Sequence, residues 1–262
     1  MSREIRQRGD PGGLGAPSQI VVDDLGGARV VVVGLEADHL RKALRIRPGE
    51  RVRATDGRGL RATLEITGFH DRAVETVVRE RHLEPASERR FWIAAFAAGA
   101  RFDWLVEKSV ELGVSGLIVL LPRRGPRPKP ERWERLARAA LGQCLGAWEA
   151  RISSAPSARG AIEAGVPGNA LWTSVQVADS TAPAGARDPR LDRAGDHLLV
   201  VGPPEGFTEA DRAFLSNSPD LARIRLGDRR LRSETAALAL LTLARLGESP
   251  RCREVDNSPG RG

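Results

Sequence analysis

The sequence predicts an α/β protein in two parts: a small N-terminal β-barrel, followed by an open, mainly parallel α/β sheet. Three observations support this fold class. Short β-rich runs separated by turns fill the first third of the chain, and strand-like runs alternate with helical patterns beyond residue 90. The chain has 262 residues, which is enough for one large or two small domains with a substantial core.

The N-terminal strands are predicted from short runs rich in β-branched residues. The candidates are residues 30–33, 50–54, 60–67 and 74–78. In residues 60–67 apolar and polar side chains alternate, as a strand with one buried face requires. Asp56-Gly57-Arg58-Gly59 is the predicted hairpin turn before this strand. Its G-x-G spacing does not indicate a dinucleotide site, because a strand and not a helix follows it.

A charged linker, residues 79–90, precedes the second part. There the candidate strands are residues 91–97, 116–121, 170–177, 197–201 and 222–226. A helix is expected to begin at Asp103 as its N-cap and to end at Gly113. A second helix is predicted because apolar residues recur at helical spacing from Trp133 to Cys144, with arginines on the opposite face.

The junction at residues 226–236 is the most informative segment of the chain. Arginines crowd positions 229–232, directly before an apolar helix that runs to about Gly247. Gly227 allows a backbone conformation that a side chain would forbid, and Ser233 or Thr235 can cap the helix start. From these residues alone, the junction is either a site for an anion or polar ligand or a structural capped helix.

The net charge of +7 is concentrated in two segments, residues 39–61 and 123–138. Such clusters supply the salt-dependent, phosphate-binding part of nucleic-acid affinity. The alternative is a solvated surface in an arginine-rich chain. The candidate RNA-binding residues are Arg41, Lys42, Arg45, Arg47, Arg123, Arg124 and Arg132.

Composition also narrows the functional class. Cys144 and Cys252 are the two cysteines of the chain, and neither has metal-ligand spacing around it. We therefore expect neither a disulfide framework nor a metal site. Residues 1–15 lack the apolar core of a signal peptide, and the longest apolar runs are too short for a membrane span. The sequence thus predicts a cytoplasmic protein without a membrane partner, with disordered tails at residues 1–19 and 248–262.

Five blocks of the sequence, in the same order, resemble the RsmE family, the 16S rRNA uracil-N3 methyltransferases of the SPOUT superfamily. The blocks are residues 39–50, 56–59, 102–114, 131–133 with Gln143, and 226–236. The resemblance implies a PUA-like β-barrel that binds RNA over residues 20–85 and a trefoil-knotted SPOUT methyltransferase domain over residues 90–247. It also implies S-adenosylmethionine as cofactor, 16S ribosomal RNA as partner and a homodimer whose active site lies near the subunit interface.

In an open parallel sheet the ligand is expected beyond the carboxyl ends of the strands. Two loops, residues 202–207 and 227–232, follow predicted strands there. In the family these loops, with backbone from the end of an earlier strand, enclose S-adenosylmethionine. The implied cofactor residues are Leu171, Trp172, Thr173, Val201, Gly202, Pro203, Gly206, Leu226, Gly227, Leu231, Ser233, Thr235 and Ala236.

The resemblance also suggests which residues take part in catalysis. Methyl transfer to uracil N3 needs a nitrogen freed of its proton, and Arg232 is the candidate for stabilising the uracil anion that develops. Glu234 is a candidate base or anchor, and its place in the first helical turn equally fits a favourable partner of the helix dipole. Glu205 is a third candidate, as a source of the carboxylate that the family's loop carries one position earlier.

The chain departs from the family at several positions. The family loop GPEGGF is here Gly202-Pro203-Pro204-Glu205-Gly206-Phe207, the family's arginine after the helix glutamine is Gly146, and an expected basic residue falls at Ala98. Three functions therefore stay open: an active uracil-N3 methyltransferase, a degenerate paralogue that binds RNA with lost or altered catalysis, or a methyltransferase with another RNA target.

Overall fold

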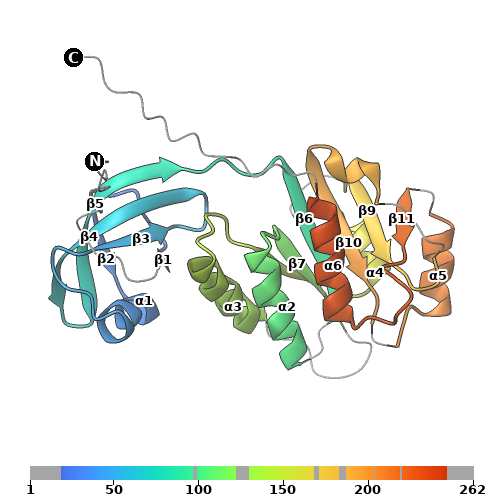
Figure 1. Ribbon diagram of the computed structural model, residues 1–262, viewed down its shortest axis with the longest axis horizontal. Helices are drawn as coiled ribbons and strands as arrows, with labels where there is room; N and C mark the ends of the chain where they lie inside the picture. Colours follow the sequence, from blue (N-terminus) through green and yellow to red (C-terminus); the bar gives the residue numbers. More distant parts are fainter. Residues whose placement is uncertain are drawn as a thin grey trace, which may run out of the picture.

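The computed structural model describes residues 19–96, 99–121, 130–167, 171–182, 187–203, 205–218 and 220–246. Over these ranges the chain forms two sheets, which lie side by side along the long axis of the molecule (Figure 1). The smaller sheet has strand order β1-β3-β4-β5-β2, and the larger one β11-β9-β10-β6-β7-β8. The α/β fold class and its strand-rich N-terminal part are confirmed.

The smaller sheet contains the four predicted strands and one more. Its strands are β1 (Gln19–Val21), β2 (Arg29–Val32), β3 (Arg51–Thr55), β4 (Leu60–His70) and β5 (Ala73–Leu83). Strand β1 is too short for its periodicity to be recognised, and Gln19, which the sequence assigned to a disordered tail, is its first residue. The rest of both predicted tails lies outside the described residues. Helix α1 (Gly34–Asp38) and a π-helical turn (His39–Ala43) pack on the same core.

All neighbouring strands of the larger sheet are parallel, as expected. They are β6 (Arg89–Phe96), β7 (Gly116–Leu120), β8 (Arg151–Ala155), β9 (Ser174–Ala178), β10 (Gly195–Val201) and β11 (Leu221–Ile224). Strand β8 was not predicted, because the segment RISSA offers little apolar pattern. Strand β9 begins four residues later than expected.

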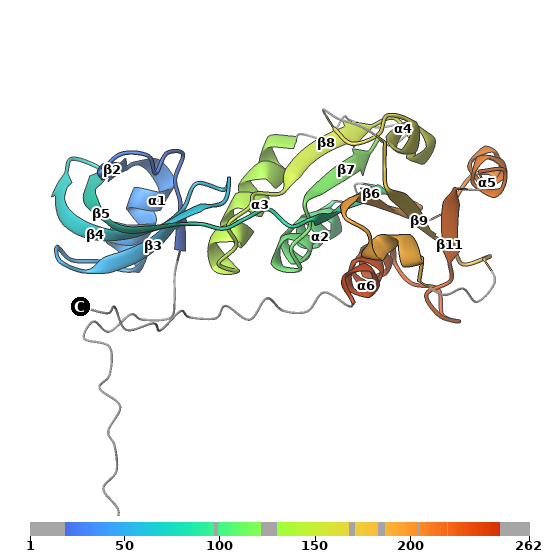
Figure 2. The ribbon, with the colours of Figure 1, turned by 90° about the horizontal axis from the view of Figure 1, so that it is seen from above.

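Helices cover both faces of this sheet (Figure 2). Helices α2 (Ala100–Glu111), α3 (Pro130–Gln143) and α6 (Ser233–Arg245) enclose one apolar core. Helices α4 (Ala158–Glu163) and α5 (Glu209–Ser216) enclose the core on the other face, and a short 3₁₀ helix (Pro189–Asp192) precedes β10. The predicted apolar face of α3 is confirmed, since Trp133, Ala137 and Ala140 are buried.

The predicted start of α2 is wrong. The helix begins at Ala100, after Gly99 with φ 55°, so Asp103 lies within its first turn and not at the N-cap. The Asp103 carboxylate instead accepts hydrogen bonds from Trp133 Nε1 (2.9 Å) and from Arg132, which joins α2 to α3. The Asp103 carboxylate thus bonds to side chains of a distant helix and not to the backbone at the start of its own helix. The predicted end at Gly113 is confirmed, since this residue has φ 73°.

The two parts are joined through the β3–β4 hairpin and the segment after α3. Gly59 N donates to Ala147 O (2.9 Å), and Glu149 N donates to Gly57 O (2.8 Å). Trp148 Nε1 donates to Glu84 O (3.1 Å), which closes the contact on the other side of the hairpin. These bonds fix the smaller sheet relative to the larger one.

Gly59 is the position at which this contact is most easily broken. We predict that Gly59→Ala lowers the free energy of unfolding by about 1–3 kcal/mol more than Gly49→Ala. Both residues have positive φ, 100° and 88°, so both substitutions cost about 1–2 kcal/mol in backbone strain. A Cβ on Gly59 would lie 2.5 Å from Trp148 Cζ2, whereas one on Gly49 meets no atom within 4 Å. Urea unfolding of both variants measures the difference, and equal losses would contradict the packing argument.

His197 is fully buried on β10, a central strand of the larger sheet, beside Phe91. Its Nε2 lies 2.9 Å from the carbonyl oxygen of Arg193, which can only accept, so Nε2 carries the proton and Nδ1 accepts from Ser174 Oγ (2.8 Å). Burial lowers the pKa of His197 below its usual value of 6.5. The neutral ring therefore stabilises the fold.

Acidification should remove this contribution. The unfolded chain takes up the proton near pH 6.5 while the folded protein resists it, so stability is full above that pH and falls as the pH drops toward the lowered value. We predict that melting temperatures measured between pH 7.5 and about pH 5.5 fall more steeply for the wild type than for His197→Gln. The exposed His82 gives the control, because His82→Gln should keep the wild-type slope. Identical slopes for all three proteins would exclude His197 as the cause.

Candidate functional site

The carboxyl ends of six parallel strands meet at one edge of the larger sheet, and the loops after β6, β10 and β11 lie there (Figure 1). Ligands of open α/β sheets bind at this edge. The two loops that the sequence singled out, residues 202–207 and 227–232, are therefore on the same edge. Their meeting point is the start of α6.

A hydrogen bond joins the two loops. Ser233 Oγ donates to the carbonyl oxygen of Gly202 at 3.1 Å, across 31 positions of sequence. This observation corrects the capping prediction: Arg232 is the N-cap residue of α6, no side chain caps the helix, and Ser233 and Thr235 lie inside its first turn. The serine hydroxyl connects the start of α6, directly after the second loop, to the loop after β10, and it does not cap the helix.

The loop after β10 needs its glycines. Val201 is buried at the end of the strand, and a Cβ on Gly202 would approach the Phe207 ring to 3.0 Å. Gly206 has φ 91°, and its N–H donates to Pro203 O (2.8 Å), which closes a tight turn. This hydrogen bond holds Pro203 and Gly206 close together, and Pro204 lies outside the described residues.

The loop after β11 leaves space above its backbone. Gly227 is exposed with φ 130°, and an added Cβ would meet no described atom within 4 Å. Around it, Leu226 is half-buried, Ala236 is buried and Leu231 is exposed. An open backbone beside the edge of a parallel sheet is suited to binding a ligand through main-chain groups.

Leu171, Trp172 and Thr173 do not belong to this site. They precede β9 and so lie at the amino edge of the sheet, where Trp172 Nε1 donates to Ala161 O (3.2 Å) and Thr173 N donates to Asp196 O (2.7 Å). The sequence placed this strand too early, because residues 170–173 are as apolar as a strand start. The carboxyl end of β9 is instead at Ala178.

Asp179, directly after β9, is the residue that this misplacement concealed. Its side chain is nearly buried and accepts from Arg223 Nη2 (2.7 Å) and from Thr181 N (2.8 Å). Burial acts to raise the pKa of Asp179, but the bonds from Thr181 and Arg223 outweigh it and hold the pKa below its ordinary value. The Asp179 carboxylate thus holds the loop that follows β9 at the same edge of the sheet.

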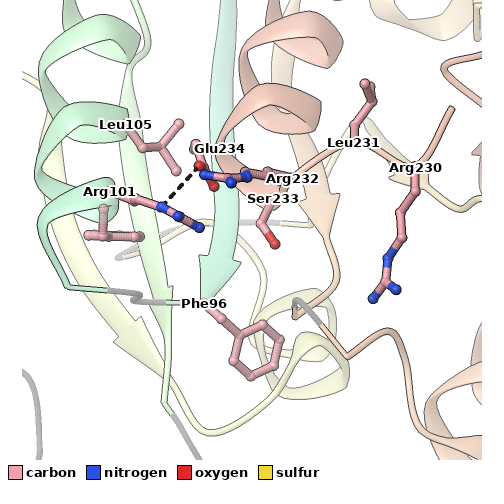
Figure 3. A pocket seen from close by; sticks show the side chains of 9 residues that line it. Phe96, Arg101, Leu105, Arg230, Leu231, Arg232, Ser233 and Glu234 are labelled. Carbon is pink, nitrogen blue, oxygen red and sulfur yellow. Dashed lines mark ion pairs between the residues drawn. The ribbon is translucent and has the colours of Figure 1, made fainter.

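A pocket of about 250 Å³ opens beside the start of α6 (Figure 3). Phe96, at the end of β6, and Arg101, Phe102 and Leu105 of α2 line it together with residues 230–234. Arg101 Nε lies 3.8 Å from Glu234 Oε1. The structure thus brings the predicted Arg232 and Glu234 together with Arg101, which sequence reasoning missed, although Arg101 immediately precedes the 102–114 block.

Glu205 is exposed on the loop after β10 and does not line this pocket. Its carboxylate has no recorded partner among the described residues. A catalytic role for Glu205 stays a prediction.

The predicted RNA-binding residues of the smaller sheet gather around the π-helical turn. The Arg41 guanidinium lies 5.8 Å from the Phe69 ring centroid, and Lys42 is 3.1 Å from Asp38. Arg45 has φ 50°, a rare conformation for a side-chain-bearing residue. Arg47 N donates to Glu50 Oε2 (2.7 Å), but within the described ranges no ion pair is recorded for the guanidinium group of Arg45 or Arg47. Both side-chain charges are therefore available to a polyanion.

The second predicted basic segment, residues 123–138, is less available to a polyanion. Arg132 Nη2 lies 2.5 Å from Asp103 Oδ2, in an exposed ion pair that offsets part of its charge. Arg123 and Arg124 lie outside the described residues.

No cluster of three His, Cys, Asp or Glu side chains suited to a metal ion occurs among the described residues. None of the helices in the described ranges combines the length and apolar character needed to span a bilayer.

Comparisons with known proteins identify the family of the chain. A family model described as an RNA methyltransferase domain matches residues 87–245, and one described as an RNA methyltransferase PUA domain matches residues 36–78. The chain is similar to "Ribosomal RNA small subunit methyltransferase E" of Bacillus subtilis, with 23% identity over 228 residues, covering 80% of this chain and 87% of that protein. The protein of the same name from Mycobacterium tuberculosis is 28% identical over 225 residues, covering 82% and 85%.

Solved structures share the fold over nearly the whole chain. Ribosomal RNA small subunit methyltransferase E from Neisseria gonorrhoeae, bound to S-adenosyl methionine, superposes with a TM-score of 0.71 at 23% identity, covering 87% of this chain and 96% of that one. A "probable rRNA-methyltransferase" from Porphyromonas gingivalis gives a TM-score of 0.68 at 28% identity, covering 86% and 95%.

Proposed function

We propose that this chain, which belongs to the RsmE-type RNA methyltransferase family, transfers a methyl group from S-adenosylmethionine to N3 of a uracil in 16S ribosomal RNA. The family membership makes the chain an RNA methyltransferase. The observation that supports the finer proposal is the Ser233–Gly202 hydrogen bond, because it joins two glycine-containing loops beside a pocket that holds Arg232 and Glu234.

The loops fit the cofactor. Open space above Gly227 and the tight turn at Gly206 let main-chain groups approach a planar adenine. The residues proposed to hold S-adenosylmethionine are Val201, Gly202, Pro203, Gly206, Leu226, Gly227, Leu231, Ser233, Thr235 and Ala236. When bound, this cofactor supplies an activated methyl group, so the protein has mainly to align the acceptor.

The chain's own charged groups would prepare that acceptor. Uracil N3 carries a proton that must leave, and Glu234 is the carboxylate of the pocket that could accept it. Arg232 would stabilise the negative charge on the deprotonated ring. Glu205, in the loop after β10, is a further predicted contributor to catalysis.

The same proposal gives each of the two parts of the chain a role. Residues 20–85 form the PUA-like RNA-binding domain, and residues 90–247 form the SPOUT methyltransferase domain with its trefoil knot. The joint at Trp148 would keep the basic turn of the first domain at a fixed distance from the site on the second. Ribosomal RNA as substrate implies action in the cytoplasm.

A homodimer is part of the proposal. Apolar side chains stay exposed on α2 and beside both ends of α6, with Trp104 45%, Leu112 38%, Leu231 37% and Leu246 56% accessible. Exposed apolar residues of this size, grouped on two adjacent helices, favour an interface. A second subunit there would lie next to the pocket.

The departure at Gly146 has a structural explanation. Its carbonyl oxygen accepts from Gln19 Nε2 (2.7 Å), and a Cβ there would lie 2.5 Å from Leu141 Cδ1. An arginine would therefore require a shift of Leu141, whose side chain fills the space beside Gly146.

Gly227 tests the cofactor site. We predict that Gly227→Val weakens S-adenosylmethionine binding at least about tenfold, because the side chain fills the space that the ligand needs. The matched control is Gly49→Val, which carries the same kind of strain at φ 88° with no neighbouring atom, far from the site. Calorimetric titration measures both, with melting temperatures as a check of folding. Wild-type affinity in Gly227→Val would exclude the loop, and absence of binding by the wild type would favour the degenerate paralogue.

Arg45 and Arg47 test the RNA surface. We predict that Arg45→Gln or Arg47→Gln weakens binding to different RNAs alike and reduces the slope of log affinity against log salt by about one. Arg79→Gln is the control, because the Arg79 guanidinium is already paired with Glu65 at 2.7 Å. Filter binding over a salt series gives the slopes. An affinity that does not depend on salt would leave both arginines as solvated surface.

A further inference from the structure

The pocket beside α6 brings guanidinium donors and one carboxylate together. In Figure 3 the side chains of Arg101 and Arg232 point toward the carboxylate of Glu234, and the Phe96 ring lies below them at the end of β6. A guanidinium donates only, and a carboxylate accepts only. The pocket thus offers an acceptor flanked by donors.

The charged side chains of the pocket differ in how far they are exposed to solvent. The Glu234 side chain is only 14% accessible, whereas that of Arg101 is 56% accessible. Phe102 and Leu105 are buried beneath them and form an apolar floor. A shielded carboxylate forms stronger hydrogen bonds than an exposed one, so whatever meets it must bring a donor.

The size of the pocket favours one planar ring. Its volume of about 250 Å³ is below the range of roughly 300–1,000 Å³ found for drug-sized ligands. A complete S-adenosylmethionine would not fit inside it. A single nucleobase would, with Phe96 available for stacking.

We propose that this pocket holds one unpaired uracil by its imide edge, and that Glu234 and Arg101 determine the preference for uracil over cytosine. The inference rests on the proposed function, since it concerns the base that is to be methylated. Uracil presents a carbonyl oxygen, the N3–H donor and a second carbonyl oxygen in a row. This order is complementary to a carboxylate flanked by guanidinium groups.

Cytosine fails at two positions of the same edge. Its N3 is an acceptor and would face the Glu234 carboxylate, and its amino group is a donor and would face a guanidinium. Both contacts are repulsive, and each mismatched base contact leaves a polar group of the pocket unpaired. The base must leave its stack to enter, which an unpaired nucleotide does at low cost.

Binding of short RNA tests this assignment without methyl transfer. The probes are an adenine oligonucleotide with one central uracil and the same oligonucleotide with one central cytosine, compared by fluorescence anisotropy at constant salt. The wild type should bind the uracil probe about tenfold more tightly than the cytosine probe. Equal affinities would overturn the proposal.

Two variants and a control separate recognition from charge and from folding. Glu234→Gln should abolish the preference, because an amide can also donate to cytosine N3. Arg101→Gln should reduce it. Arg159→Gln removes the same charge from α4, where Arg159 pairs with Glu163 at 2.8 Å, and should leave the preference unchanged.

The outcomes distinguish the two proposals. If Glu234 only stabilised the start of α6, Glu234→Gln would lower the melting temperature and retain the preference, which would overturn the recognition role. A wild type that binds S-adenosylmethionine but does not prefer uracil would overturn only the base assignment. A wild type that does not bind S-adenosylmethionine would overturn the proposed function itself.

Discussion

The parallel direction of all six strands in the larger sheet is the constraint on which the site depends. Because every strand ends at the same edge, loops that are far apart in sequence are gathered there. The Ser233–Gly202 hydrogen bond then fixes two of them to each other. Helix α2 adds Arg101 to the same edge, since it starts where β6 ends. The pocket and the open space over Gly227 both follow from this arrangement.

The second determinant is the joint between the two parts. Ala147 and Glu149, on either side of Trp148, exchange backbone hydrogen bonds with the β3–β4 hairpin, and the Trp148 ring lies so close to Gly59 that a side chain there would clash. Gly146 adds a further bond between the two parts, because its carbonyl oxygen accepts from Gln19 Nε2 (2.7 Å). A rigid joint makes the separation between the basic turn near Arg45 and the pocket a property of the fold. Recognition of a large RNA can depend on such a fixed separation.

The sequence was sufficient where the signal is local. Alternating apolar residues predicted β4, and helical spacing predicted α3. The sequence was not sufficient where a side chain bonds to a residue far away in the chain. Asp103 bonds to α3 and does not cap α2, and Ser233 bonds to the loop after β10. For the candidate site, the motif predicted Gly227 and Glu234 at the loop and helix start where the structure has them. Arg101 could not be placed beside Glu234, because only the tertiary fold brings these two residues together.

The most direct test of the account is to map modified nucleotides after methyl transfer. The wild-type protein would be incubated with S-adenosylmethionine and small-subunit ribosomal RNA from cells that lack this enzyme, and the RNA fragments analysed by mass spectrometry. We predict one new methyl group, on N3 of a single uracil. No transfer to the RNA, or a methyl group on another base, would contradict it.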